Sequence, residues 1–253
     1  MRRPGANRRA TRGFGALAGV LILSPDQMSQ TVTGWFRGDV GYDAGPPGDW
    51  QNDGSAGNVT ESTAAQVPTT GTLGSIATVE FDGTDDQLST TTDNVDDYIT
   101  TTGWTVGGVI RRGATSSNSS AGTPYLNHIL VGDNNNNWGV DCRTTGLQAY
   151  QWQSGYRYTD PIAIPQDVGI FFMSWFDGST VYMSTQGVEE TVASGAINGS
   201  LSGDMCLGDT SSGAAFDVGV GELCIWSGAL SAQERLGFQN YIAITRSGFG
   251  VTP

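Results

Sequence analysis

The chain has few of the residues from which metal centres and disulfide frameworks are built. Its 253 residues include one histidine, His128, and three cysteines, Cys142, Cys206 and Cys224. An odd number of cysteines allows at most one disulfide, and the absence of a CxxC pair or a His–Cys cluster argues against a structural zinc site. We therefore expect the cysteines to be small buried hydrophobic residues in strands.

Charge is also scarce, and lysine is missing altogether. Only 15% of the residues are charged, all twelve basic residues are arginine, and the net charge is -13. Residues 1–12 carry five of these arginines and no acid, so the rest of the chain has seven arginines against 25 acidic residues. A body with this excess of negative charge repels nucleic acid and anionic membranes. We expect no nucleic-acid partner.

No apolar run is long enough to cross a membrane. The run at residues 14–23, FGALAGVLIL, falls short of the roughly 20 apolar residues that a spanning helix needs. Together with the arginines it has the layout of a signal peptide, but no small-x-small cleavage site follows it. We interpret residues 1–27 as an extended arm that becomes ordered on docking into a neighbouring subunit, with a signal peptide as the alternative. The expected docking residues are Arg2, Arg3, Arg8, Arg9, Arg12, Phe14, Leu17 and Leu21.

Glycine, in contrast, is abundant at 37 residues, and Thr, Ser, Asn and Asp are frequent. This composition is typical of short strands joined by tight turns and predicts an all-β fold. Strands are expected at residues 31–37, 76–81, 104–111, 128–132, 138–142, 147–153, 168–176, 180–184, 205–207 and 218–226. Their number and spacing indicate a two-sheet sandwich. Residues 41–74 have little hydrophobic periodicity, so we expect them to form a long surface excursion.

Two local signals are more specific. Asp177-Gly178, between two expected strands, predicts a hairpin because its turn needs a positive φ that glycine accepts without steric cost. Ser231 and Glu234 have the spacing of a capping box, in which each side chain satisfies an exposed amide of the first helical turn. A helix of about three turns is therefore expected near the C-terminus.

Three stretches, taken in order, resemble a known family. Residues 34–39 read GWFRGD, residues 79–88 read VEFDGTDDQL, and residues 221–234 read GELCIWSGALSAQE. Over residues 32–246 the chain is similar to LamG-like domains of the concanavalin A-like lectin/glucanase class from bacteria and tailed phages. The resemblance implies a jelly-roll sandwich of two antiparallel sheets over residues 28–253, with the arm before it and a short C-terminal helix.

The aspartates in the second stretch have two interpretations. Asp side chains beside Gly83 readily accept hydrogen bonds from the backbone of a tight turn. The alternative is a Ca²⁺ site formed by Asp82, Asp85 and Asp86, because hard carboxylate oxygens gather there and some members of the resembled family bind calcium. No other cofactor is expected.

The sequence lacks the carboxylate pattern of glycan-cleaving enzymes on this fold. Such enzymes usually place acids at alternate positions of one strand, which sends both to the same face. Here Glu189 and Glu190 are adjacent, and Glu222 stands alone in the expected closing strand. No GxSxG elbow and no GxxxxGK loop occurs either. We therefore expect a protein that is not an enzyme.

Two segments instead favour glycan binding. Residues 133–138, DNNNNW, and residues 150–158, YQWQSGYRY, combine aromatic rings with amides and charged groups. Such sets hold sugars because the rings stack on the apolar sugar face while the hydroxyls take directed hydrogen bonds. The alternative is that Trp138 and Trp152 lie in the core. The candidate glycan-binding residues are Asp133, Asn135, Trp138, Trp152, Tyr156 and Tyr158.

A basic arm joined to a LamG-like body indicates a virion structural protein of a tailed bacteriophage, such as a head decoration protein, a spike base or a tail component. Its partners would be other virion proteins reached through the arm, further copies of itself in a homo-oligomer, and a cell-surface glycan. The first alternative is a secreted bacterial LamG-like adhesin, which predicts a processed N-terminus. The second, less favoured, is a glycoside hydrolase.

Overall fold

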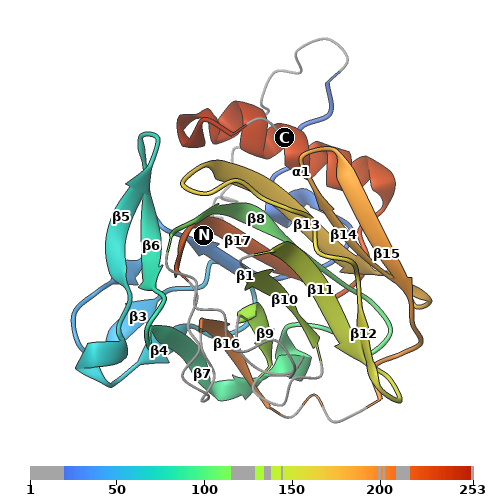
Figure 1. Ribbon diagram of the computed structural model, residues 1–253, viewed down its shortest axis with the longest axis horizontal. Helices are drawn as coiled ribbons and strands as arrows, with labels where there is room; N and C mark the ends of the chain where they lie inside the picture. The colour runs from blue at the N-terminus through green and yellow to red at the C-terminus, as the bar shows by residue number, and fades with distance from the viewer. Residues whose placement is uncertain are drawn as a thin grey trace, which may run out of the picture.

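The fold is a sandwich of two antiparallel sheets with an α-helix on its outside (Figure 1). The computed structural model describes residues 20–114, 129–133, 138–143, 145–198, 201, 203–208 and 217–251. Most of the expected arm, His128 and Asn135 lie outside these residues. The architecture confirms the predicted all-β sandwich of two antiparallel sheets with a C-terminal helix.

Sheet A is organised around its longest strand, β17, which pairs with β1, β6 and β8. The strand order is β15-β14-β13-β8-β17-β6-β5, with β1 attached to β17. The strands are β1 (Val32–Arg37), β5 (Thr69–Leu73), β6 (Ile76–Asp82), β8 (Trp104–Arg112), β13 (Gly169–Phe176), β14 (Thr180–Thr185), β15 (Val188–Ala193) and β17 (Asp217–Trp226).

Sheet B faces sheet A across the core and has the order β12-β11-β10-β9-β16-β7-β4-β3-β2. Its strands are β2 (Tyr42–Asp43), β3 (Gly48–Trp50), β4 (Val59–Glu61), β7 (Gln87–Asn94), β9 (Ile129–Asp133), β10 (Trp138–Arg143), β11 (Gly146–Trp152), β12 (Tyr156–Tyr158) and β16 (Asp204–Gly208). The short strand β12 therefore forms one edge of this sheet, paired on one side with β11.

The main core lies between the two sheets, where alternate residues of each strand point inward. Trp104 of sheet A and Trp138 of sheet B meet there, with ring centroids 5.5 Å apart and neither ring exposed. The indole nitrogen of Trp104 donates to the side-chain oxygen of Gln151, 3.1 Å away, so its polar group is satisfied. Burying an aromatic side chain of this size contributes roughly 4 to 6 kcal/mol of hydrophobic free energy.

A second core forms where helix α1 (Ala232–Thr245) covers the other face of sheet A. Phe238 of the helix is fully buried and lies 5.0 Å from the ring of Trp226 and 5.7 Å from that of Phe171. The helix begins with the predicted capping box, in which Ser231 accepts from the Glu234 amide and the Glu234 carboxylate accepts from the Ser231 amide. Within the described residues, no helix is both long and apolar enough to cross a membrane.

Two further predictions are confirmed. The hairpin of β13 and β14 turns at Asp177-Gly178, where Gly178 has φ +97° and an Asp177 carboxylate oxygen accepts the amides of Ser179 and Thr180. All three cysteines are buried, and none of them forms a disulfide.

The prediction for residues 41–74 was wrong in one respect. The segment is not a surface excursion, because it contributes β2, β3 and β4 to sheet B and β5 to sheet A. Trp50 and Val59, on β3 and β4, are fully buried in the main core. Strands of two or three residues are too short to display an alternating pattern, so periodicity could not reveal them.

Residues 20–27, the last part of the expected arm, lie against the folded body. The Leu23 amide donates to the Gly237 carbonyl at 3.1 Å, and the Asn240 side chain donates to the Leu21 carbonyl at 2.8 Å. The buried indole of Trp226 donates to the Pro25 carbonyl at 3.1 Å. These contacts join the segment to α1 and to the end of β17.

Deletion of residues 1–27 should therefore destabilise the body, since it leaves the Trp226 indole without its acceptor and uncovers apolar surface on α1. We expect a loss of about 2 to 4 kcal/mol in the free energy of unfolding, measured by urea denaturation. Deletion of residues 1–19 keeps every contact named above and is the matched control. Equal stability of the two truncated proteins would contradict the role given to residues 20–27.

Candidate functional site

The aromatic residues of the β11–β12 hairpin gather on one face of sheet B. Leu147 and Ala149 point into the main core, and Gln151 on the same side meets Trp104. Side chains alternate along a strand, so Tyr150 and Trp152 point to the opposite, outer face.

The register of β12 adds two more rings to that face. Tyr158 stands opposite Tyr150, and Tyr156 stands opposite Trp152. Directly paired residues of antiparallel strands share a face, so all four rings lie on the outside of the sandwich. We call Tyr150, Trp152, Tyr156 and Tyr158 the aromatic face.

The four rings hold one another in place. Trp152 and Tyr156 meet edge to face with centroids 4.7 Å apart, while Tyr156 and Tyr158 stack at 5.6 Å. Tyr150 contacts Tyr158 at 5.9 Å and is itself buried. The other three rings are half-buried, so part of each reaches solvent. Such edge and stacked contacts stabilise aromatic pairs by roughly 0.5 to 1.5 kcal/mol each.

Hydrogen-bonding groups lie next to the rings. On the same face, one pair further along β11, the Gln148 amide donates to the Asp141 carboxylate at 3.2 Å. In the turn between the strands, Gln153 is half-buried and Ser154 is exposed. Opposite Tyr150 stands Gly139, where any Cβ would come within 2.8 Å of the tyrosine ring. The absence of a side chain at Gly139 therefore leaves room for the Tyr150 ring.

The structure divides the predicted glycan-binding residues. Trp152, Tyr156 and Tyr158 come together, whereas Trp138 is fully buried in the main core and must be removed from the set. Trp138 stands opposite Gln151, which fixes its side chain on the inner face. The Asp133 side chain and Asn135 lie outside the described residues. Tyr150 was missed, although its spacing of two residues from Trp152 marks it as a neighbour on the same strand face.

The Asp82–Asp86 segment is a tight turn after β6. An Asp86 carboxylate oxygen accepts the Asp82 amide, and an Asp82 carboxylate oxygen accepts the Thr84 amide, both at 2.8 Å. Gly83 takes φ +76°. These bonds confirm the structural interpretation of the motif. Ligand oxygens of Asp82, Asp85 and Asp86 also lie within 4.8 Å of one another, so the calcium site stays a prediction.

Asp86 is the most buried of these acids, with 4% of its surface exposed. Its pKa is raised to about 6, chiefly by burial and also by the charges of Asp82 and Asp85, which together outweigh the lowering effect of the Asp82 amide. A carboxyl whose folded pKa exceeds its unfolded value of about 3.9 favours folding below pH 4. That contribution is lost as the pH rises through about 6.

Asp86→Asn should accordingly stabilise the protein at neutral pH, because the amide keeps an acceptor for the Asp82 backbone without carrying a buried charge. Urea denaturation between pH 4 and pH 8 should show a gain of up to about 3 kcal/mol at pH 7 that shrinks toward pH 4. A gain that is constant with pH, or a loss at every pH, would contradict the assignment. Millimolar calcium at pH 7 should stabilise the parent and not the variant if the cation site exists.

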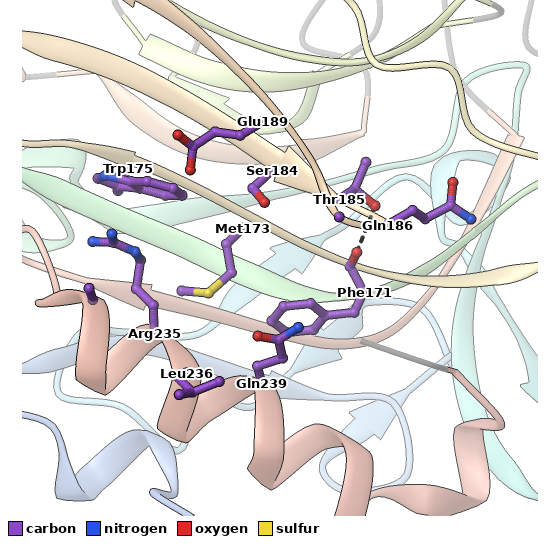
Figure 2. Close-up of a pocket in the computed structure, with 12 residues that line it drawn as sticks. Phe171, Met173, Trp175, Ser184, Thr185, Gln186, Glu189, Arg235, Leu236 and Gln239 are labelled. Carbon is purple, nitrogen blue, oxygen red and sulfur yellow. Dashed lines mark hydrogen bonds between the residues drawn. The ribbon is translucent and has the colours of Figure 1, made fainter. Parts of the chain in front are cut away.

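A pocket of about 340 Å³ opens on the other side of the sandwich, between α1 and the outer face of β13–β15 (Figure 2). Figure 2 shows Arg235 and Gln239 reaching from the helix toward Ser184 and Glu189 on the strands, with Met173 between them. No sequence motif marks this pocket, since its residues come from two separate stretches of the chain, the consecutive strands β13–β15 and the helix α1.

No protein-family model matches the chain, and no curated protein is significantly similar to it. Solved structures do share its fold. Domain 4 of AbnA, a GH43 extracellular arabinanase from Geobacillus stearothermophilus solved in complex with arabinotriose, aligns over 82% of this chain and 97% of its own length, with a TM-score of 0.53 and 14% identity. The binding domain of Paraclostridial Mosquitocidal Protein 1 aligns over 84% and 52%, with a TM-score of 0.54 and 9% identity.

Trypanosoma rangeli sialidase aligns over 87% of this chain and 33% of its own length, with a TM-score of 0.54 and 6% identity. The chain thus spans about half of the mosquitocidal binding domain and about a third of the sialidase. Identities this low show a common fold alone. That fold is a β-sandwich of two antiparallel sheets.

These similarities contradict the prediction that the chain is not an enzyme. Chains with this fold include a domain of an arabinanase and part of a sialidase, so the fold by itself does not exclude catalysis. The prediction was wrong because it relied on the lack of acidic residues at alternate positions of one strand. Catalytic groups can instead come from loops and from several strands, which leaves no such local pattern.

Proposed function

We propose that this chain is a carbohydrate-binding module and that the aromatic face is its binding surface. The observation that carries the proposal is the convergence of Trp152, Tyr156 and Tyr158, three half-buried rings, on the outer face of one edge hairpin. Rings that contact one another on a sheet keep a fixed orientation. The protein therefore loses little additional side-chain entropy when a sugar binds to these rings.

The chemistry of the surface suits a neutral glycan. The C–H face of a pyranose or furanose ring packs on an aromatic ring, and its hydroxyls need donors and acceptors close by. Gln153 and Ser154 lie in the turn that joins the two strands carrying the rings, and both reach solvent. The fold shared with an arabinanase domain solved in complex with arabinotriose supports the ligand class.

We further propose that the module is part of a larger assembly, a tailed-phage virion. Residues 1–19 would attach the module to that particle. The support is the cluster of five arginines ahead of the acidic body. The alternative remains a secreted adhesin, for which the N-terminus would be processed. Intact-mass measurement of the mature protein separates the two, because a virion component with a docking arm keeps residues 1–19 and a processed adhesin loses them.

Alanine substitution on the aromatic face should weaken glycan binding without unfolding the protein. On an array of bacterial surface polysaccharides and plant glycans, Trp152→Ala and Tyr156→Ala should each reduce affinity for the bound glycan by about tenfold, through loss of ring stacking. Arg157→Ala is the matched control, because this exposed residue alternates with the tyrosines and points to the other side of β12. The proposal fails if the parent binds no glycan, or if all three variants bind equally well.

A further inference from the structure

The pocket between α1 and β13–β15 has an apolar base. Phe171 and Met173 are 8% and 4% exposed, and both point from β13 toward the helix. Leu236 stands at the rim on α1 and is 52% exposed. A ligand that covers this base and rim would therefore remove apolar surface from water.

Neutral polar groups surround the base. Gln186, Gln239 and Ser184 line the pocket, and among the described residues none of their side chains has a hydrogen-bond partner within the protein. A carboxamide and a hydroxyl both donate and accept, so this set can pair with groups of either kind. Hydrophobic floors with a few available polar groups are typical of small-molecule sites, and a volume of about 340 Å³ is at the small end of their range.

The backbone at Gln186 gives a separate indication. It has φ +52°, in the left-handed region that residues other than glycine, Asn and Asp rarely adopt, and Gly187 follows with φ +76°. The two residues form the turn of the β14–β15 hairpin, where Asn-Gly would be the unstrained choice. Strained positions of this type cluster at functional sites. Here the turn places Gln186 in the lining of the pocket.

The charges in the pocket balance. The Arg235 guanidinium stacks over the Trp175 ring at 3.9 Å and donates to the Leu230 carbonyl at 2.6 Å. Glu189 lines the same pocket, and the negative charges of Glu189 and Asp177 both act on Arg235. A strongly anionic ligand would meet these carboxylates, and a cationic one would meet Arg235. The balance favours a neutral ligand that is rich in hydroxyl groups and has one apolar face.

We propose that this pocket binds one saccharide residue, with the apolar sugar face on Met173 and Leu236 and the hydroxyls on Ser184, Gln186 and Gln239. This site lies on the outer face of sheet A, whereas the aromatic face lies on the outer face of sheet B, so the two bind separately. It does not depend on the proposed function of the aromatic face, because no residue is shared.

The test uses the full chain and a panel of monosaccharides, namely glucose, galactose, mannose, arabinose and N-acetylglucosamine, each titrated to tens of millimolar. Two-dimensional NMR follows the indole N–H of Trp175 and the side-chain amides of Gln186 and Gln239, while the indole N–H of Trp152 reports on the aromatic face. We expect at least one sugar to shift the Trp175 and glutamine signals in a saturable manner. Gln239→Ala and Ser184→Met, which remove a polar group and fill the pocket respectively, should each weaken that binding about tenfold or more.

Gln233→Ala is the matched control, because Gln233 lies on the same helix outside this pocket and is exposed. Trp152→Ala should leave the Trp175 response unchanged. The inference is overturned if no sugar shifts the Trp175 and glutamine signals, or if Gln239→Ala and Ser184→Met bind as the parent does. If sugars shift the Trp152 signal alone, binding in the pocket is overturned and binding on the aromatic face is supported. If they shift the Trp175 signal alone, binding in the pocket is supported and binding on the aromatic face is not.

Discussion

An ion pair between a fully buried carboxylate, Glu222, and the partly buried Arg246 holds the helix on the outside of this protein. Glu222 lies in the middle of β17 with none of its surface exposed, and its carboxylate is 2.7 Å from the Arg246 guanidinium that follows α1. The same carboxylate accepts hydrogen bonds from the Trp35 indole at 2.9 Å and the Tyr241 hydroxyl at 3.2 Å. Burial raises the pKa of Glu222 even against these three partners. A charge this deep is tolerated because several groups share it, and removing one partner of such a pair typically costs about 3 to 5 kcal/mol.

Because this network joins β1, β17 and α1, it determines where the helix can lie. Arg246 also makes a two-pronged contact with Asp39, at 2.7 and 2.9 Å, so the end of the helix is held from two sides. At the other end, Glu234 both caps the helix and accepts the Ser29 amide, and these hydrogen bonds lower its pKa to about 2 despite partial burial. A helix fixed at both ends keeps Arg235 over Trp175, and so maintains the pocket beneath it.

Features encoded by neighbouring residues could be predicted from the sequence, whereas features that depend on register could not. The Asp177-Gly178 turn and the Ser231–Glu234 cap each follow from residues within one turn, and both form as expected. Trp138 could not be placed, since its face depends on standing opposite Gln151, and a shift of one residue would have turned it outward. The pocket under α1 could not be predicted either, because Met173, Ser184 and Gln239 are brought together only by the tertiary packing of the helix on the sheet.

The layering of the sandwich gives the two proposed sites opposite directions. The aromatic face points away from one side of the core and the helix-covered pocket away from the other, so a single short ligand cannot reach both. A chain with this geometry would bridge two separate glycan strands instead of binding a single strand with higher affinity. On a surface dense in such strands, weak individual contacts would combine into a much slower overall release, with the gain set by how far apart the strands stand.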